Sequence, residues 1–427
     1  MTGKTMSELT SAEQTIAEQT IRQRIHRNGK IAFAEFMQIA LYHPSGGYYT
    51  SDRPFGADGD YYTSPAAHPA FGALLAVQLF GIWRGMGMPT NFTVVEMGAG
   101  NGMLANDICA YASDLSADFA DSLRYICIDR YAPADTWQST GEGAIHIERV
   151  TADKLPLEGV VGCFISNELA DAFPVHRFEI VDGEPREIFV ALDDSGDFVE
   201  LLDTPSTPII VQRLDALGFA LENGQRGEVN PHIKSWIGEI AAALDTGIVI
   251  TIDYGYEAVE LYAPERKYGT LQTYYRHTDG SSPYRRIGRQ DLSAQVDFTL
   301  LQCEGRAAGL NTFAYTTQSE FLHALGIRDM MLQLRSAPLS HHDRSANLMA
   351  MRQLVQPDGL GRFRVLMQEK QSGVSSIEQI LPDESARRGL LAPLLSSRHM
   401  PLMEGRYPQT SWEMPSLWDE SQAYQLL

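Results

Sequence analysis

The fold of this chain is decided by the stretch Thr93-Val94-Val95-Glu96-Met97-Gly98-Ala99-Gly100-Asn101-Gly102-Met103. It opens with a short apolar run typical of a strand, and a helical pattern begins near its last residue. The glycines between them carry no side chain and tolerate positive φ, so the backbone there can pass close beneath a ligand. Strand, glycine turn and helix in this order predict a ligand-binding turn, whereas the glycine spacing alone is weak evidence.

Short apolar segments alternate with helical patterns on either side of this turn. Such alternation predicts an α/β fold with a mostly parallel sheet and helices on both faces. Ligand sites in these sheets lie beyond the carboxyl ends of the strands. The other expected strands are Arg124–Asp129, 144–149, Val160–Ser166, Gly247–Asp253 and Phe363–Gln368.

The chain is long enough for additions around this sheet. A hairpin is expected at 176–181 and 187–192 around Asp182-Gly183, a dipeptide that favours tight hairpin turns. We expect an N-terminal helical and lid segment (1–90), a Rossmann-like cofactor-binding core (91–171), an insertion of a hairpin plus helices between strands four and five (172–243), a second part of the core with substrate-side elements (244–370), and a C-terminal extension (371–427).

The residues around the glycine turn predict the kind of cofactor. The spacing differs from the G-x-G-x-x-G that cradles a pyrophosphate, and the acidic Glu96 stands two positions before Gly98, where it would repel phosphate. A cofactor with an ammonium group and a ribose suits these residues, which favours S-adenosyl-L-methionine. Glu96 would then accept from the ammonium or its water, Asp129 would bind the ribose hydroxyls, and Asp153 would receive the adenine amino group. Alternatively, these acids cap helices or lie in solvated loops.

A second polar group follows the fourth expected strand, at Asn167, Glu168 and Asp171. In this architecture the corner faces the transferable methyl group. An amide and two carboxylates suit a nitrogen nucleophile that carries positive charge, because carboxylates hold a guanidinium through paired, charge-assisted hydrogen bonds. The alternative is that two of these groups cap the next helix.

The amino-acid composition indicates which classes of partner the chain favours. The chain has 427 residues, and its 54 acidic against 34 basic residues give a formal charge of −20, which disfavours nucleic acid and favours a cationic substrate or basic partner. Acidity that serves only solubility is the alternative.

No apolar run has the length of a membrane span, and the N-terminus resembles neither a secretory nor a mitochondrial signal, so we expect no membrane contact and a cytoplasmic location. The scattered cysteines and the adjacent His341 and His342 predict no metal site.

Several separated motifs resemble the MidA-type methyltransferases, a family that includes the arginine-methylating assembly factor of mitochondrial complex I. The resemblance runs from about Ile21 to Lys370. It is carried by Tyr42-His43-Pro44, Gly47-Tyr48-Tyr49, Gly59-Asp60-Tyr61-Tyr62-Thr63-Ser64, Phe71-Gly72, the Glu96 turn, Asn167-Glu168, Asp171-Ala172-Phe173-Pro174, Ile252-Asp253-Tyr254-Gly255-Tyr256, Gly269-Thr270-Leu271, Tyr275-Arg276-His277 and Val296-Asp297-Phe298.

The resemblance implies a Rossmann-like class I methyltransferase core, S-adenosyl-L-methionine as cofactor and an arginine guanidinium, free or within a protein, as acceptor. It also indicates a homodimer. It places Gly98, Gly100 and Gly102 along the cofactor with Asp129 on its ribose, and Thr63 and Ser64 closing over it. Around the acceptor it places Asn167, Glu168, Asp171, Asp253 and Tyr254.

The sequence departs from the family pattern at three places. Gln295 stands where the family usually has His, Leu169-Ala170 replaces aromatic residues, and a tail extends past Lys370. These departures leave two alternatives open. One is a small-molecule O- or N-methyltransferase of secondary metabolism, and the other is a cofactor-binding assembly factor without turnover.

Overall fold

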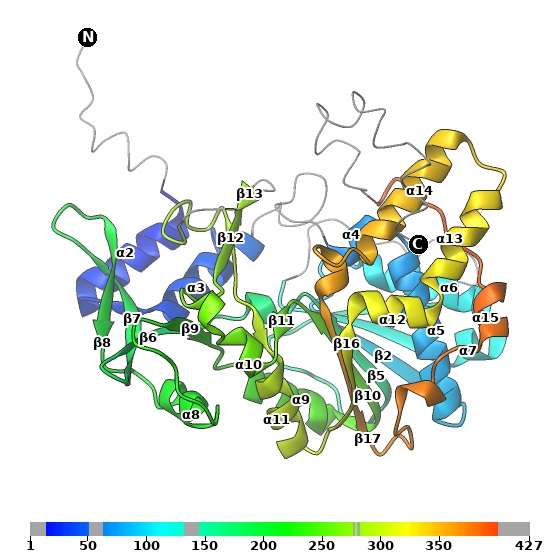
Figure 1. The fold of residues 1–427 in the computed structure, drawn as a ribbon, viewed down its shortest axis with the longest axis horizontal. Helices are drawn as coiled ribbons and strands as arrows, with labels where there is room; N and C mark the ends of the chain where they lie inside the picture. The colour runs from blue at the N-terminus through cyan, green and yellow to red at the C-terminus, as the bar shows by residue number, and fades with distance from the viewer. Residues whose placement is uncertain (1–13, 51–62, 132–144, 276–277, 280–281, 400–427) are drawn as a thin grey trace, which may run out of the picture.

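A seven-stranded sheet forms the centre of the molecule in the computed structural model, which describes residues 14–50, 63–131, 145–275, 278–279 and 282–399 (Figure 1). The strand order is β16-β17-β10-β5-β2-β3-β4. The five strands from β10 to β4 are parallel, and β17 runs antiparallel to both of its neighbours. The bounds are β2 Phe92–Met97, β3 Leu123–Asp129, β4 Ile147–Thr151, β5 Val160–Asn167, β10 Leu244–Asp253, β16 Asn311–Thr317 and β17 Arg364–Lys370.

This arrangement confirms the predicted α/β fold with a mostly parallel, Rossmann-like sheet. The expected strands all form, although β4 begins three residues later than the predicted 144–149 because Ile147 is the first residue that pairs with β3. The sequence analysis did not predict β16, whose side chains are mostly half-buried and show no clean alternation. It extends the sheet beyond β17.

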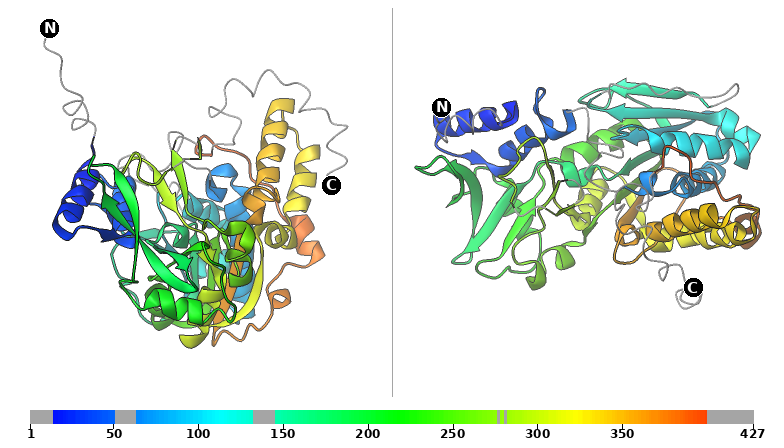
Figure 2. Two further views of the ribbon diagram at one scale, coloured as in Figure 1. Left: turned by 60° about the vertical axis from the view of Figure 1, so that its left-hand side comes forward. Right: turned by 90° about the horizontal axis from the view of Figure 1, so that it is seen from above.

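Helices cover both faces of the sheet (Figures 1 and 2). On one face α5 packs against α6, and their apolar side chains form a core with Val94, Tyr125 and Ile250. On the other face α9 and α11 pack over Val95, Phe164 and Val249. The helices around the sheet are α4 Ser64–Ala67, α5 Ala70–Gly85, α6 Met103–Leu115, α7 Ala117–Ser122, α9 Ile233–Ala243, α10 Ala258–Leu261, α11 Phe298–Ala307, α12 Gln318–Leu325, α13 Ile327–Ser336, α14 His341–Leu354 and α15 Glu384–Gly389.

The insertion between β5 and β10 builds a second sheet of order β1-β7-β6-β9, with β8 also paired to β7. The predicted hairpin is confirmed, with Asp182 and Gly183 both at positive φ in its turn. N-terminal helices α2 and α3 pack on this sheet through Phe36 and Val190, to the left of the central sheet in Figure 1. The bounds are α2 Ile16–Asn28, β1 Ile31–Ala32, α3 Phe33–Tyr42, β6 His176–Val181, β7 Glu184–Leu192, β8 Phe198–Asp203, α8 Ile209–Asp215 and β9 Arg226–Val229.

Two groups of small strands lie outside the two larger sheets. They are β11 Gly255–Tyr256, paired with β15 Val296–Asp297, and a small sheet of β12 Gln272–Tyr275, β13 Thr278–Asp279 and β14 Asp291–Ser293. In Figure 1 the strands β12 and β13 lie between the N-terminal helices and the central sheet.

The first part of the C-terminal extension packs on the central domain. The Ile380 carbonyl oxygen would lie 1.9 Å from a Cβ at position 81, so Gly81 on α5 is needed for this contact. Further along, the His399 Nε2 atom lies 2.9 Å from an Asp107 carboxylate oxygen on α6. The domain boundaries stay a prediction, and the Gly59–Tyr62, Arg276-His277 and 400–427 segments lie outside the described residues.

Two further observations concern the cysteines and the length of the helices. Cys109, Cys127 and Cys163 are buried free thiols, while Cys303 is exposed. None of the helices in the described ranges combines the length and the apolar character that a membrane crossing requires.

Candidate active site

The glycine turn lies at the carboxyl end of β2 and leads directly into α6. Gly98, Gly100 and Gly102 all have positive φ, at 71°, 53° and 71°, a conformation that glycine adopts without strain. The Gly98 backbone N–H donates to the Ile128 carbonyl at 2.8 Å, which ties the turn to the end of β3. The turn therefore presents backbone rather than side chains at the edge of the sheet.

Asp129 holds the turn from the neighbouring strand. Its Oδ2 accepts from the Gly100 N–H at 2.9 Å, and its Oδ1 accepts from the Tyr131 N–H at 3.2 Å. Each carboxylate oxygen keeps a further lone pair for a ligand. Asp153 follows β4 at the same edge and is exposed. Sequence reasoning missed Arg149, which donates to the Gly100 carbonyl at 2.8 Å.

Glu96 lies apart from the edge where the turn ends. Its side chain points into the core between the sheet and α6, where the Tyr125 hydroxyl donates to it at 2.9 Å. Burial raises the pKa of this carboxyl to about 8. Its predicted contact with the cofactor stays a prediction, and the structure shows it anchored to β3.

The corner after β5 brings Glu168 into contact with both the N-terminal segment and β5 itself. Its Oε1 accepts from the Asn167 side-chain amide at 3.0 Å and from the Ser64 backbone N–H at 3.3 Å. Glu168 has a φ of 52°, which a residue with a side chain rarely adopts. Burial, with Asp171 and Asp291 nearby, raises the pKa of the Glu168 carboxyl to about 8. Thr63 is the residue before α4 and is half-buried.

Asp253 organises the corner through the backbone. Its Oδ2 accepts from the Leu169 and Ala170 N–H groups at 3.2 and 2.9 Å, and its Oδ1 accepts from the Tyr254 N–H at 2.9 Å. Its side chain is 1% exposed, and burial beside Asp171 raises its pKa well above the usual range. These bonds make Asp253 a positioning residue that joins β10 to the turn after β5.

Asp171 and Tyr254 form a hydrogen-bonded pair in the same corner. The Tyr254 hydroxyl donates to Asp171 Oδ2 at 2.5 Å, while Asp171 Oδ1 is buried without a hydrogen-bond partner in the described structure. Burial raises the pKa of Asp171 to about 6. The Asn167 Oδ1 atom is likewise buried and unpaired. Two orphaned acceptors in one corner suit a ligand that brings N–H donors.

Aromatic residues from the N-terminal segment and a further acid complete this corner. The Tyr42 hydroxyl donates to the Ala172 carbonyl at 2.8 Å, and its ring stacks on that of Tyr49. The Tyr49 hydroxyl in turn donates to Asp291 Oδ1 at 3.0 Å. Asp291 is 3% exposed and was missed by sequence reasoning, because its place depends on the pairing of β14 with β12. We use the term acidic corner for Glu168, Asp171, Asp253 and Asp291.

The glycine turn and the acidic corner lie side by side. A Cβ atom on Gly98 would meet the Leu169 side chain at 2.7 Å, so the turn after β2 touches the turn after β5. The structure thus brings the predicted cofactor residues Gly98, Gly100, Gly102 and Asp129 next to the predicted acceptor residues Asn167, Glu168, Asp171, Asp253 and Tyr254, with Ser64 in contact.

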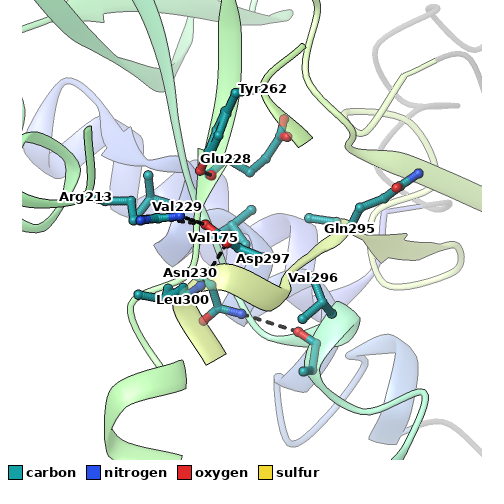
Figure 3. A pocket seen from close by; sticks show the side chains of 12 residues that line it. Val175, Arg213, Glu228, Val229, Asn230, Tyr262, Gln295, Val296, Asp297 and Leu300 are labelled. Atoms are coloured by element: carbon teal, nitrogen blue, oxygen red, sulfur yellow. Dashed lines mark hydrogen bonds and ion pairs between the residues drawn. The ribbon is translucent and has the colours of Figure 1, made fainter. Parts of the chain in front are cut away.

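A small cavity lies behind the corner (Figure 3). Arg213 of α8 and Asp297, 2.6 Å apart, form a buried ion pair in its wall, and Asp297 also accepts from the Leu300 N–H at the start of α11. The Asn230 amide donates to the Ala170 carbonyl at 3.3 Å. These contacts explain the Val296-Asp297-Phe298 motif as structural support for the corner. The described ranges hold no group of His, Cys, Asp and Glu that could bind a metal.

Comparison with known proteins agrees with this geometry. Residues 74–316 match the model of a family described as S-adenosyl-L-methionine-dependent methyltransferases. A Drosophila melanogaster relative, named the mitochondrial protein arginine methyltransferase NDUFAF7 homolog, is 29% identical over 66% of this chain and 68% of its own. The Mus musculus protein arginine methyltransferase NDUFAF7 is 27% identical over 82% of this chain and 80% of its own.

Two solved structures from Burkholderia thailandensis share the fold. One has S-adenosyl-homocysteine bound, with a TM-score of 0.74 and 24% identity, covering 90% of this chain and 100% of that chain. The other is a native crystal structure with a TM-score of 0.72 and 25% identity, covering 89% of this chain and 97% of that chain.

Proposed function

This chain belongs to the family of S-adenosyl-L-methionine-dependent methyltransferases, and from that premise we propose that it methylates a guanidinium nitrogen of arginine, free or within a protein. The observation that carries the acceptor is the acidic corner, where Glu168 is buried with Asp171 and Asp291 nearby, so that burial and then repulsion between the acids raise its pKa. A cationic, planar donor relieves that repulsion and fills the orphaned acceptors. The names of the Drosophila and mouse relatives support this acceptor.

The glycine turn fits the cofactor. Gly98 and Gly100 leave room beneath a ligand, and Asp129 offers free lone pairs to ribose hydroxyls beside the turn. When bound, the cofactor supplies an electrophilic methyl group on a sulfonium. Gly98, Gly100, Gly102 and Asp129 would hold it, with Ser64 closing over it from α4.

The corner residues would bind and orient the acceptor. Glu168 and Asp171 accept N–H groups of the guanidinium, and the Tyr254 hydroxyl fixes the Asp171 carboxylate. As the N–CH3 bond forms, the S–CH3 bond breaks and its electron pair stays on sulfur. The nitrogen then gives a proton to Glu168, whose raised pKa makes it a stronger base than an ordinary carboxylate.

Other expectations stay predictions. They are the cytoplasmic location, the homodimer, and the lack of nucleic-acid or membrane partners. The Drosophila and mouse relatives are named as mitochondrial proteins, which lends no support to a cytoplasmic location.

The test is a transfer assay with labelled S-adenosyl-L-methionine. L-arginine and an arginine-containing protein are compared with lysine, histidine and catechol, and products are identified by mass spectrometry. We expect label on guanidinium nitrogen only. Label on oxygen or another amine would favour a different small-molecule acceptor, and cofactor binding without any transfer would favour the assembly-factor alternative.

A further inference from the structure

A second cavity of about 270 Å³ lies beside the acidic corner at the same edge of the sheet. It forms where β10 and β16 end and β17 begins, because Asp253 and Thr317 both pair with Arg364. Its lining includes Tyr254, Tyr256, Gln295, Glu320, Arg362 and Arg364. In Figure 1 the elements β11, β16 and α12 mark its position.

Tyr254 is shared by the cavity and the acidic corner. Its hydroxyl donates to Asp171, and the same residue is part of the cavity lining. An acceptor that occupied both the acidic corner and the cavity would therefore contact this tyrosine. Gln295, which stands where the family usually has His, lines the cavity as well.

The cavity wall carries positive charge in two arginines. Arg362 is exposed, and within the described residues its guanidinium has neither an ion pair nor a hydrogen bond. Arg364 donates to Glu260 at 3.2 Å through Nη2, but its Nε is buried and has no partner among the described residues. Arg362 is the last residue of the short 3-10 turn Leu360–Arg362, and Arg364 is the first residue of β17. The two arginines are therefore only two positions apart in the chain.

The acidic residue in this wall, Glu320, already accepts hydrogen bonds from its neighbours. Glu320 accepts hydrogen bonds from the Thr316 and Thr317 hydroxyls and from the Thr317 N–H, and these bonds lower its pKa to about 2. It is the third helical residue of the capping box that opens α12, with Thr317 as the N-cap, and its Oε2 is already committed to these bonds. The unpaired Arg362 is therefore the group in this wall that a ligand anion would meet.

We propose that this cavity is the acceptor subsite for a carboxylate, with Arg362 as the residue that selects it. The proposal rests on the proposed function and deepens it: the acceptor carries a guanidinium for the acidic corner and an anion for Arg362. The carboxylate is either the α-carboxylate of free arginine or an acidic side chain near arginine in a protein. A charge-assisted arginine–carboxylate pair has the strength and geometry for this selection.

The experiment compares matched acceptors with Arg362→Gln. One arm uses L-arginine and L-argininamide, which lacks the carboxylate charge. The other arm uses acetylated peptides with a central arginine flanked by Glu or by Gln. Arg328→Gln, an exposed arginine on α13 away from the cavity, is the matched control.

Arg362→Gln is expected to raise KM about tenfold for the carboxylate acceptor of one arm, with kcat and the uncharged acceptor unchanged. The arm that responds identifies the source of the carboxylate. The difference should shrink at high salt, because Arg362 is exposed. An equal effect on charged and uncharged acceptors, or no effect in either arm, would overturn the proposal.

A wild-type protein that methylates no guanidine compound would refute the proposed function instead. The subsite is then tested separately by saturation-transfer NMR with N-acetylglycine. Loss of the signal in Arg362→Gln but not in Arg328→Gln supports the subsite, and equal signals in both variants contradict it.

Discussion

The glycine turn and the acidic corner touch each other, yet they are built in opposite ways. The turn consists of backbone at positive φ, and its main side-chain contact is an acid, Asp129, bonded to the Gly100 amide. The corner consists of buried acids: burial raises the pKa of Glu168, Asp171 and Asp253, and neighbouring carboxylates add to the rise for Glu168 and Asp253. Hydrogen bonds from the backbone to Asp253 and from Tyr254 to Asp171 fix their positions. The difference teaches that the proposed cofactor side depends on the shape of the backbone, whereas the proposed acceptor side depends on buried carboxyl groups whose ionised form a bound cation would stabilise.

The largest effect is expected from a substitution in the glycine turn that should weaken cofactor binding. Gly100→Val places a β-branched residue at a φ of 53° and fills the path beneath the ligand, so cofactor affinity should fall by more than about 100-fold. Calorimetric titration with S-adenosyl-L-homocysteine measures this. An unchanged affinity would remove the turn from the cofactor site.

The next largest effect is expected from removing the Asp253 carboxylate, which holds the backbone of the acidic corner in place. Asp253→Ala leaves three backbone N–H groups without their acceptor, so the free energy of unfolding should fall by about 3 kcal/mol and activity should fall with it. Denaturant unfolding measures the loss. Asp245→Ala, on the exposed face of the same strand, is the control and should unfold like wild type.

A smaller effect sharpens the role of Asp129. Asp129→Asn removes the charge that would strengthen hydrogen bonds to ribose, so cofactor affinity should fall about tenfold with the fold intact. Asp121→Asn on α7, which is exposed, serves as the control. Equal affinity in the two variants would contradict a ribose contact.

The smallest effect concerns pH. If Glu168 accepts the proton, kcat/KM should rise with pH through its pKa of about 8 and level off above it. The sign for stability is opposite: the folded state binds more protons between the ordinary value of 4.5 and about 8, so stability falls as pH rises through this window. Glu168→Gln should therefore lose less stability than wild type between pH 5 and pH 9, measured by thermal unfolding.

The sequence predicted the elements whose signals are local. The strand before Gly98, the acids at the ends of β3 and β5, and the Asp182-Gly183 hairpin follow from apolar runs, turn residues and spacing. Glu96 was likewise placed at the end of β2, but spacing did not reveal its partner, because strand alternation turns its side chain toward Tyr125 and the core. Its contact with the cofactor stays a prediction.

Other parts depend on contacts between distant segments. Asp291 reaches the corner through β14, and Tyr49 meets it from the N-terminal segment, 242 positions away in the chain. The backbone-bonding role of Asp253 depends on the register between β10 and β5. No local pattern carries this information, so the composition of the acidic corner could be predicted only in part.

The division between the two regions is tested most directly by Glu168→Gln in one paired measurement. The dissociation constant of S-adenosyl-L-homocysteine and the single-turnover rate of methyl transfer to arginine are determined on the same samples. We predict an unchanged dissociation constant and a transfer rate lowered by about 100-fold or more. Full turnover in this variant, or a loss of cofactor affinity as large as the loss of rate, would contradict the account.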